Sequence, residues 1–155
     1  MNTPASTFAT ERQLLDSLTA LLKEEQRLLV AADAEGVSAI TPRKTQLVQQ
    51  LATEAAVRHR ALAAAGFAGG EAGMDPWLAA QGAGDVRTQW ESLLEAAREA
   101  KELNRVNGML INKHMANGQQ QLVELGVTEA GGNAAVYGPG GLSIGAGPSK
   151  KFVVG

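Results

Sequence analysis

The chain has 155 residues, a formal net charge of −2 from 14 basic and 16 acidic side chains, and no cysteine. Aromatic residues supply only 4% of it, so any core is thin and aliphatic, which favours long helices over a globule. No basic run is longer than Lys150-Lys151, which argues against nucleic acid as a partner. Because neither a signal-peptide pattern nor a membrane-length apolar run occurs, we expect a soluble cytoplasmic protein without membrane insertion.

The first predicted helix is amphipathic and spans about residues 7–34. Leucines return every three or four positions along it, at 14, 15, 18, 21, 22, 28 and 29, and charged residues mostly fall between them. The segment from Asp33 to Gly36 interrupts this pattern, with the glycine in a helix-stop position. We therefore place a turn between Ala34 and Thr41.

The second predicted helix spans about residues 38–65 and resumes the same spacing. Pro42 lies early in this segment, so the regular helix is expected to start near Thr41, with Thr41 as its N-cap and Pro42 at its first position. A short connection between two amphipathic helices makes them antiparallel neighbours.

Glycines and prolines then mark a connection over residues 66–84. Asp75 followed by Pro76 predicts an N-cap and a first-turn proline for a short helical turn over about residues 75–80. This turn would present Trp77 to the bundle. Trp77 and Trp90 are the only tryptophans, and both are expected to be core side chains rather than platforms that stack a ligand.

The third predicted helix, residues 85–125, contains two Asn-Gly pairs, and Asn-Gly is a strong hairpin signal. An almost unbroken heptad-like stripe nevertheless passes through both pairs: Val86, Trp90, Leu93, Ala97, Ala100, Asn104, Asn107, Ile111, Met115, Gly118, Leu122 and Leu125. A hairpin at Asn107-Gly108 would break that register, and the flanking segments lack strand alternation. We therefore predict one continuous helix.

No helical or strand periodicity is present in residues 126–155, which we expect to form a flexible, Gly-rich tail. The predicted fold class is all-α: an elongated antiparallel helical bundle or coiled coil of three main helices over residues 1–125, followed by this tail. Amphipathic helices without predicted strands can bury their apolar faces only against other helices, which leaves few other fold classes.

Polar residues inside the apolar stripe suggest a specialised surface on the third helix. Asn104 and Asn107 lie in the stripe, as expected where pairing and register are specified at some cost in stability, and Gly108 would let another backbone approach. The distal half of this helix would carry apolar positions that its own chain does not cover, a feature typical of a protein-binding surface. Alternatively, both asparagines project into solvent and the glycine is merely tolerated.

Candidate chemistry is sparse. His59 and His114 are the only histidines, and neither has a metal-ligating residue at i+3 or i+4, so we expect no metal site, no cofactor and no catalytic residue. His59 faintly resembles the phosphate acceptor of a histidine phosphotransfer module. In the segment His59-Arg-Ala-Leu-Ala-Ala, however, an Ala-Ala pair stands where such modules have a Lys-Gly pair. A solvated surface histidine is the simpler interpretation. The spacing of Arg58, Arg60, Arg98 and Lys101 likewise suggests a solvated face.

Two short blocks resemble the FlgN-type flagellar export chaperones. The first is Asn104-Arg-Val-Asn107-Gly108 and the second is Tyr137-Gly-Pro-Gly-Gly141. Glu25 and Lys44 in the leucine-rich hairpin, and Trp90, also fit the family, and the resemblance runs from about Leu14 to Gly141. The second block departs from the family's acidic form, with Gly140 in place of an aspartate.

The resemblance implies a non-enzymatic cytoplasmic chaperone for the hook-filament junction proteins FlgK and FlgL, which delivers their disordered terminal segments to the export gate protein FlhA. The client-binding residues would be Asn104, Asn107, Gly108, Ile111, Met115, Leu122 and Leu125, and Tyr137 would contact the gate. A docked rather than mobile Tyr137 is the alternative for the tail. A structural coiled coil that pairs with itself as a homodimer is the alternative for the whole chain.

Overall fold

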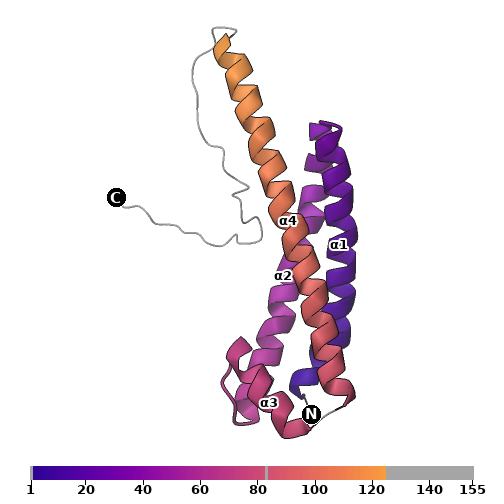
Figure 1. Ribbon diagram of the computed structural model, residues 1–155, viewed down its shortest axis with the longest axis vertical. Coiled ribbons are helices and arrows are strands. Elements are labelled where there is room, and N and C mark those ends of the chain that lie inside the picture. The colour runs from indigo at the N-terminus through magenta and orange to yellow at the C-terminus, as the bar shows by residue number, and fades with distance from the viewer. Residues whose placement is uncertain (1, 83, 125–155) are drawn as a thin grey trace, which may run out of the picture. The chain divides into compact units, whose positions relative to one another are not determined.

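The computed structural model describes residues 2–82 and 84–124, with side chains up to Ala116. These residues form helices and short connections with no strand among them, which confirms the all-α fold class. The elements, labelled in Figure 1 where there is room, are η1 (Pro4–Thr7), α1 (Phe8–Val30), α2 (Ala34–Ala64), η2 (Glu71–Gly73), α3 (Met74–Gln81) and α4 (Asp85–Glu124). None of the described helices is long and apolar enough to cross a bilayer.

The chain divides into two compact units. Unit 1 consists of Met1–Ala20 and Pro42–Ala100, and unit 2 consists of Leu21–Thr41 and Lys101–Gly155. Helices α1, α2 and α4 each contribute residues to both units.

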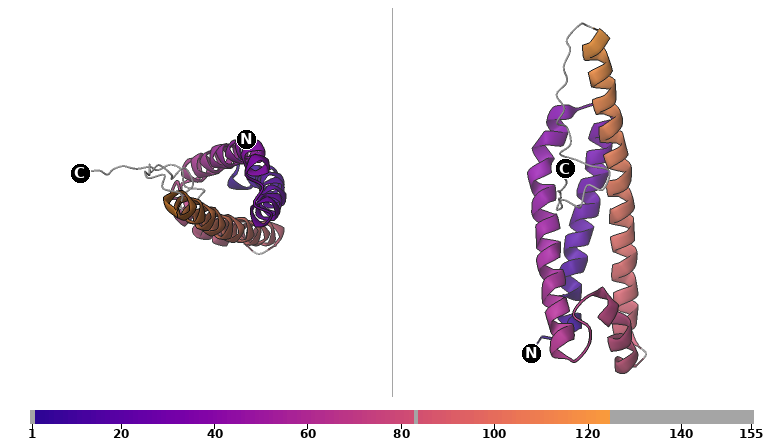
Figure 2. Two further views of the ribbon diagram at one scale, coloured as in Figure 1. Left: turned by 90° about the horizontal axis from the view of Figure 1, so that it is seen from above. Right: turned by 90° about the vertical axis from the view of Figure 1, so that its left-hand side faces the viewer.

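Unit 1 packs segments of α1, α2 and α4, which run side by side in the views of Figures 1 and 2, together with α3. Its buried apolar side chains include Phe8, Leu18, Leu47, Leu62, Met74, Trp77, Leu78 and Trp90. Trp77 and Trp90 are each only 5% exposed, which confirms their predicted place in the core. The Trp90 ring also stacks on Phe8 of α1, with ring centroids 5.5 Å apart.

The turn between α1 and α2 lies earlier than the sequence pattern suggested. Helix α1 ends at Val30, and Ala32 adopts the left-handed conformation with φ of 57°. The carboxylate of Asp33 accepts a hydrogen bond from the backbone N–H of Gly36 at 2.9 Å, which is the bond of an N-cap residue. Gly36 therefore lies in the first turn of α2, and its predicted role as a helix stop is wrong.

The predicted start of the second helix near Thr41 is also wrong, because α2 already begins at Ala34 and contains Pro42. A proline inside a helix cannot donate to the carbonyl four residues earlier, here that of Ser38. Ser38 is exposed, so water can satisfy this carbonyl. The hydroxyl of Thr41 donates to the carbonyl of Val37 at 2.9 Å, as in a helix interior, and is not a cap.

Helix α3 starts at Met74 with Gly73 as its N-cap, so Asp75 and Pro76 occupy its second and third positions rather than the predicted cap and first position. Helix α4 is continuous from Asp85 to Glu124, and no hairpin forms at Asn107-Gly108. The last residue of the predicted third helix and the predicted tail, residues 126–155, lie outside the described residues.

Candidate functional site

A buried polar contact joins α1 and α4 in unit 2. The side-chain amide of Asn107 donates two hydrogen bonds of 2.8 Å, one to the backbone carbonyl of Leu22 and one to Oε1 of Glu25. Glu25 and Asn107 are both fully buried. A buried asparagine with specific hydrogen-bond partners on a neighbouring helix is a feature that can fix the register of two helices, which is the role that the sequence pattern suggested.

The neighbours of Asn107 on the stripe are also buried in unit 2. Asn104 is 2% exposed, Ile111 is 7% exposed and Gly108 is buried. The alternative in which both asparagines project into solvent is therefore wrong. The buried Gly108 directly after Asn107 is consistent with close helix packing, since it adds no side chain.

An apolar pocket of about 240 Å³ opens beside this segment, entirely within unit 2. We call it the turn pocket, because the end of α1, the connecting turn and the start of α2 form one wall and α4 forms the other. Its lining residues are Leu29, Ala32, Asp33, Ala34, Val37, Ser38, Ile111, His114 and Met115. Aliphatic side chains dominate this lining, and Met115 remains 39% exposed.

The structure thus brings two predicted client-binding residues, Ile111 and Met115, into one pocket. Asn104, Asn107 and Gly108 do not line it. The side chain of Leu122, together with Leu125 and Tyr137, lies outside the described residues, so their roles stay predictions.

Sequence reasoning missed the wall of the turn pocket that α1 and α2 provide. Leu29 was assigned only to the apolar face of its helix, and Val37 lies just before the predicted second helix. Asp33, four residues from each of them and a residue type with strong N-cap preference, was the available signal that a helix junction lies there.

Unit 1 contains a buried ion-pair network centred on Arg58. This guanidinium donates to both carboxylate oxygens of Glu11, at 2.9 and 3.1 Å, and to Glu71 at 2.9 Å. It also lies over the Trp90 ring, 4.8 Å from the centroid. Arg58 is only 4% exposed, so its predicted place on a solvated face is wrong. The helical spacing could not predict that Arg58 is buried, because its partners Glu11 and Glu71 belong to other elements.

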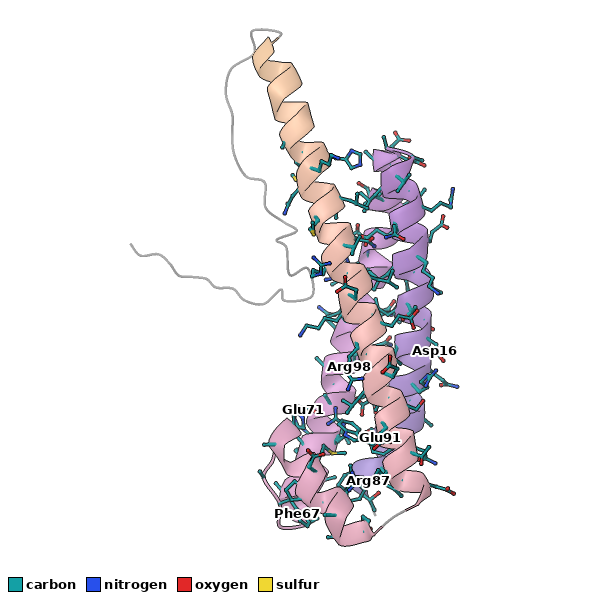
Figure 3. All side chains as sticks on the ribbon, in the orientation of Figure 1. Asp16, Phe67, Glu71, Arg87, Glu91 and Arg98 are labelled. Atoms are coloured by element: carbon teal, nitrogen blue, oxygen red, sulfur yellow. The ribbon has the colours of Figure 1, made fainter. Side chains whose placement is uncertain are left out.

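The charges in this network shift two pKa values. Burial alone would lower the pKa of Arg58, but the hydrogen bonds and charges of Glu11 and Glu71 outweigh burial and hold that pKa above its ordinary value. Burial alone would raise the pKa of Glu71, yet the hydrogen bond with His59 and the charge of Arg58 lower it. Figure 3 labels Glu71, which lies on the segment that follows α2.

His59 is part of the same network. Its Nε2 atom lies 2.9 Å from Oε2 of Glu71, and its side chain is 29% exposed. The negative charge of this carboxylate at Nε2 would repel a phosphoryl group, which disfavours the phosphotransfer alternative. Among the described residues, no group of three or more potential ligands could hold a metal ion.

A second open groove, of about 350 Å³, lies within unit 1 over Trp90. Its walls carry small or aliphatic side chains from α2 and α4, together with Leu15 of α1, and the charged residues Glu11, Arg58 and Glu71 also line it. The residues that form the walls are Leu51, Ala52, Ala55, Leu93, Leu94 and Ala97.

Open apolar pockets between helices are the feature expected of a protein that receives a polypeptide segment, by the helix-in-groove mode of recognition. The chain belongs to the FlgN family, because the family model for FlgN protein matches residues 1–143. The family acts as chaperones in flagellum biogenesis and protein export. No curated protein and no solved structure matches the chain.

Proposed function

We propose that this protein is a cytoplasmic, non-enzymatic chaperone that binds the terminal helices of the junction proteins FlgK and FlgL and delivers them to the export gate protein FlhA. The observation that carries the proposal is the family match over residues 1–143, together with an apolar pocket at the stripe that the sequence assigned to the client. We further propose that the helices form an elongated antiparallel bundle followed by a Gly-rich tail.

The proposed client surface follows α4 from the buried asparagines Asn104 and Asn107 toward the C-terminal end of the helix. Ile111 and Met115 line the turn pocket, and α4 continues as a helix to Glu124, past Leu122 on the same stripe. Asn104, Asn107 and Gly108 are buried, so a client can touch them only by displacing their present neighbours. Leu125 would extend the surface, and Tyr137 would contact the gate.

Release at the gate requires modest affinity. A disordered client segment loses conformational entropy when it folds on a groove, and this cost weakens binding per unit of buried area. No nucleotide or other cofactor is needed for such a cycle.

Co-purification of the full chain with FlgK and FlgL tests the proposal, followed by calorimetry on two variants. Leu122→Asp should weaken client binding at least tenfold without loss of helicity, because it replaces an apolar side chain of the proposed client surface with a charge. Asn112→Asp, at an exposed position of α4, is the control and should bind as wild type. Failure of both junction proteins to bind, with a concentration-dependent homodimer instead, would favour the structural coiled coil.

A further inference from the structure

We propose that the turn pocket receives one large apolar side chain of the client helix, and that Asp33 at its rim pairs with a basic side chain close to that anchor. This inference rests on the proposed chaperone function and names the chemistry that selects the client segment.

The size and lining of the turn pocket fit a side chain better than a small-molecule ligand. Its volume of about 240 Å³ exceeds the roughly 150 Å³ of an engineered apolar cavity that binds benzene. It is smaller than the roughly 300–1,000 Å³ that is typical of cofactor and drug-sized sites. Only Asp33, Ser38 and His114 bring polar side chains to a lining that is otherwise aliphatic. A leucine, methionine or phenylalanine side chain matches this space.

The walls of the turn pocket favour a helix as the carrier of that side chain. They consist of helix surfaces and one turn, and a helix in such a groove is read through anchors spaced at i, i+3 or i+4 and i+7. Met115 is unbranched and 39% exposed, so it can adjust to the shape of the anchor. Helix α4 continues for nine residues beyond Met115, to Glu124, alongside which further anchors could lie.

The negative charge of Asp33 at the rim of the turn pocket favours a client whose apolar anchor has a basic residue close to it. Asp33 is exposed and, besides His114, is the only titratable side chain that lines the turn pocket. Its Oδ1 atom caps α2 through the N–H of Gly36, which holds the carboxylate in place. The charge of Asp33 acts on Arg27, but the guanidinium of Arg27 donates its hydrogen bonds to the carboxylate oxygens of Glu24, at 2.5 and 3.1 Å. A lysine or arginine of the client therefore complements this rim.

Methyl NMR on the full chain tests the pocket directly. With ¹³C-methyl methionine labels, addition of the junction protein that co-purifies should shift the Met115 methyl signal. The methyl signals of Met74, which is buried in unit 1, and of Met109, which is exposed but does not line the pocket, should stay in place. Client binding with an unmoved Met115 signal would overturn the inference while leaving the chaperone function intact. Absence of any binding would overturn both.

Filling the turn pocket gives the second test. Ser38→Trp adds a large ring to the lining and should lower client affinity at least tenfold. Ala39→Trp, on the next and exposed position of α2 outside the pocket, is the matched control and should change affinity less than twofold. Equal affinity for the two variants would overturn the inference. A wild-type dimer that only Ser38→Trp dissociates, without client, would also overturn it and assign the pocket to a second copy of the chain.

Asp33→Asn separates the charge from the cap, because asparagine caps helices about as well as aspartate. The variant should melt near wild type but bind the client severalfold more weakly at low salt, and this difference should vanish at high salt. An unchanged affinity at low salt would remove the basic flank from the inference.

Discussion

Arg58 links several elements of unit 1 through its buried ion pairs and its contact with Trp90. Removal of one partner from a buried ion pair leaves the other charge buried without compensation, which typically costs about 3–5 kcal/mol. Glu11 would be that charge, since its side chain is only 6% exposed and the Thr7 hydroxyl that would still donate to it carries no charge. Arg58→Ala should therefore lower the free energy of unfolding by about 3 kcal/mol or more in denaturant titrations.

The matched control for that prediction is Arg98→Ala. Arg98 pairs with Glu95 on the surface, where the two side chains are 67% and 78% exposed, and such pairs contribute little. A loss below about 0.5 kcal/mol is expected for this control. If both alanine variants unfold at the same denaturant concentration, the Glu11 contact is not an important source of stability.

Glu71 should make stability depend on acid pH. A carboxylate whose pKa is lowered by folding stabilises the fold above its unfolded pKa, and that contribution is lost as the pH falls through the folded pKa. The pKa of Glu71 is lowered from an ordinary value of 4.5, mainly by His59 and Arg58 acting against burial. The stability gap between wild type and Glu71→Gln should thus be present at pH 7 and close as the pH falls below 4.5 and through the lower pKa of the folded state. Urea titrations at pH 7, 5 and 3 measure this gap; a gap that is constant over this range would contradict the expectation.

The sequence could not show that Arg58 is buried, because a solvated and a paired arginine look alike at helical spacing. Glu11 comes from α1 and Glu71 from η2, 47 and 13 residues away from Arg58. Only the tertiary structure brings these charges together. Trp90 was easier to place, since a rare large aromatic residue on an apolar stripe has few locations other than the core.

The connection between α2 and α3 depends on Gly73. A Cβ atom at this position would overlap the backbone carbonyl of Ala68, which cannot rotate away as a side chain could. Gly73→Ala should therefore destabilise unit 1 by about 1–3 kcal/mol, the usual cost of overpacking. Gly70→Ala is the control, because a Cβ there meets nothing within 4 Å. Thermal melts that place both variants at the wild-type midpoint would show that the connection adjusts freely.

Long-range periodicity predicted the helices well, whereas local stop signals misled at their ends. The continuous stripe on α4 outweighed two Asn-Gly pairs, because packing of an entire face opposes the cost of a glycine, which is about 1 kcal/mol relative to alanine. Gly36 and Pro42 suggested boundaries that the structure does not have. The cap at Asp33 starts α2 earlier, and an exposed proline is tolerated inside it.

The candidate site was predictable only on one side. Ile111 and Met115 belong to the heptad-like stripe of one helix, so the periodicity of that helix alone was enough to predict them. Leu29 and Val37 join them through the turn between two helices, and the sequence carries no signal for which helix they face. Asp33 was visible as a turn residue, but its place at the rim of a pocket required the structure.

At the scale of the whole molecule, a chaperone that hands over its cargo needs separate contacts for the client and for its destination. Family membership supplies the export role, and the turn pocket is the place that we propose for a client helix. Tyr137 lies within the part of the chain that the family model matches, 12 residues after the last residue of the predicted third helix. A tyrosine offers a large amphipathic contact at low side-chain entropy, which suits a separate contact with the gate.

Tyr137→Ala should therefore separate delivery from binding. Because the proposed client contacts lie on α4 and the turn pocket, client affinity by calorimetry and the melting midpoint should both stay close to wild type. Recovery of the cytoplasmic domain of FlhA in a pull-down should fall, and secretion of the junction proteins should slow. Ser38→Trp should show the reverse pattern, with weak client binding and normal recovery of the gate domain. Equal recovery by wild type and Tyr137→Ala would remove the tyrosine from delivery, and a clearly lowered midpoint would instead indicate that its ring packs against the helices.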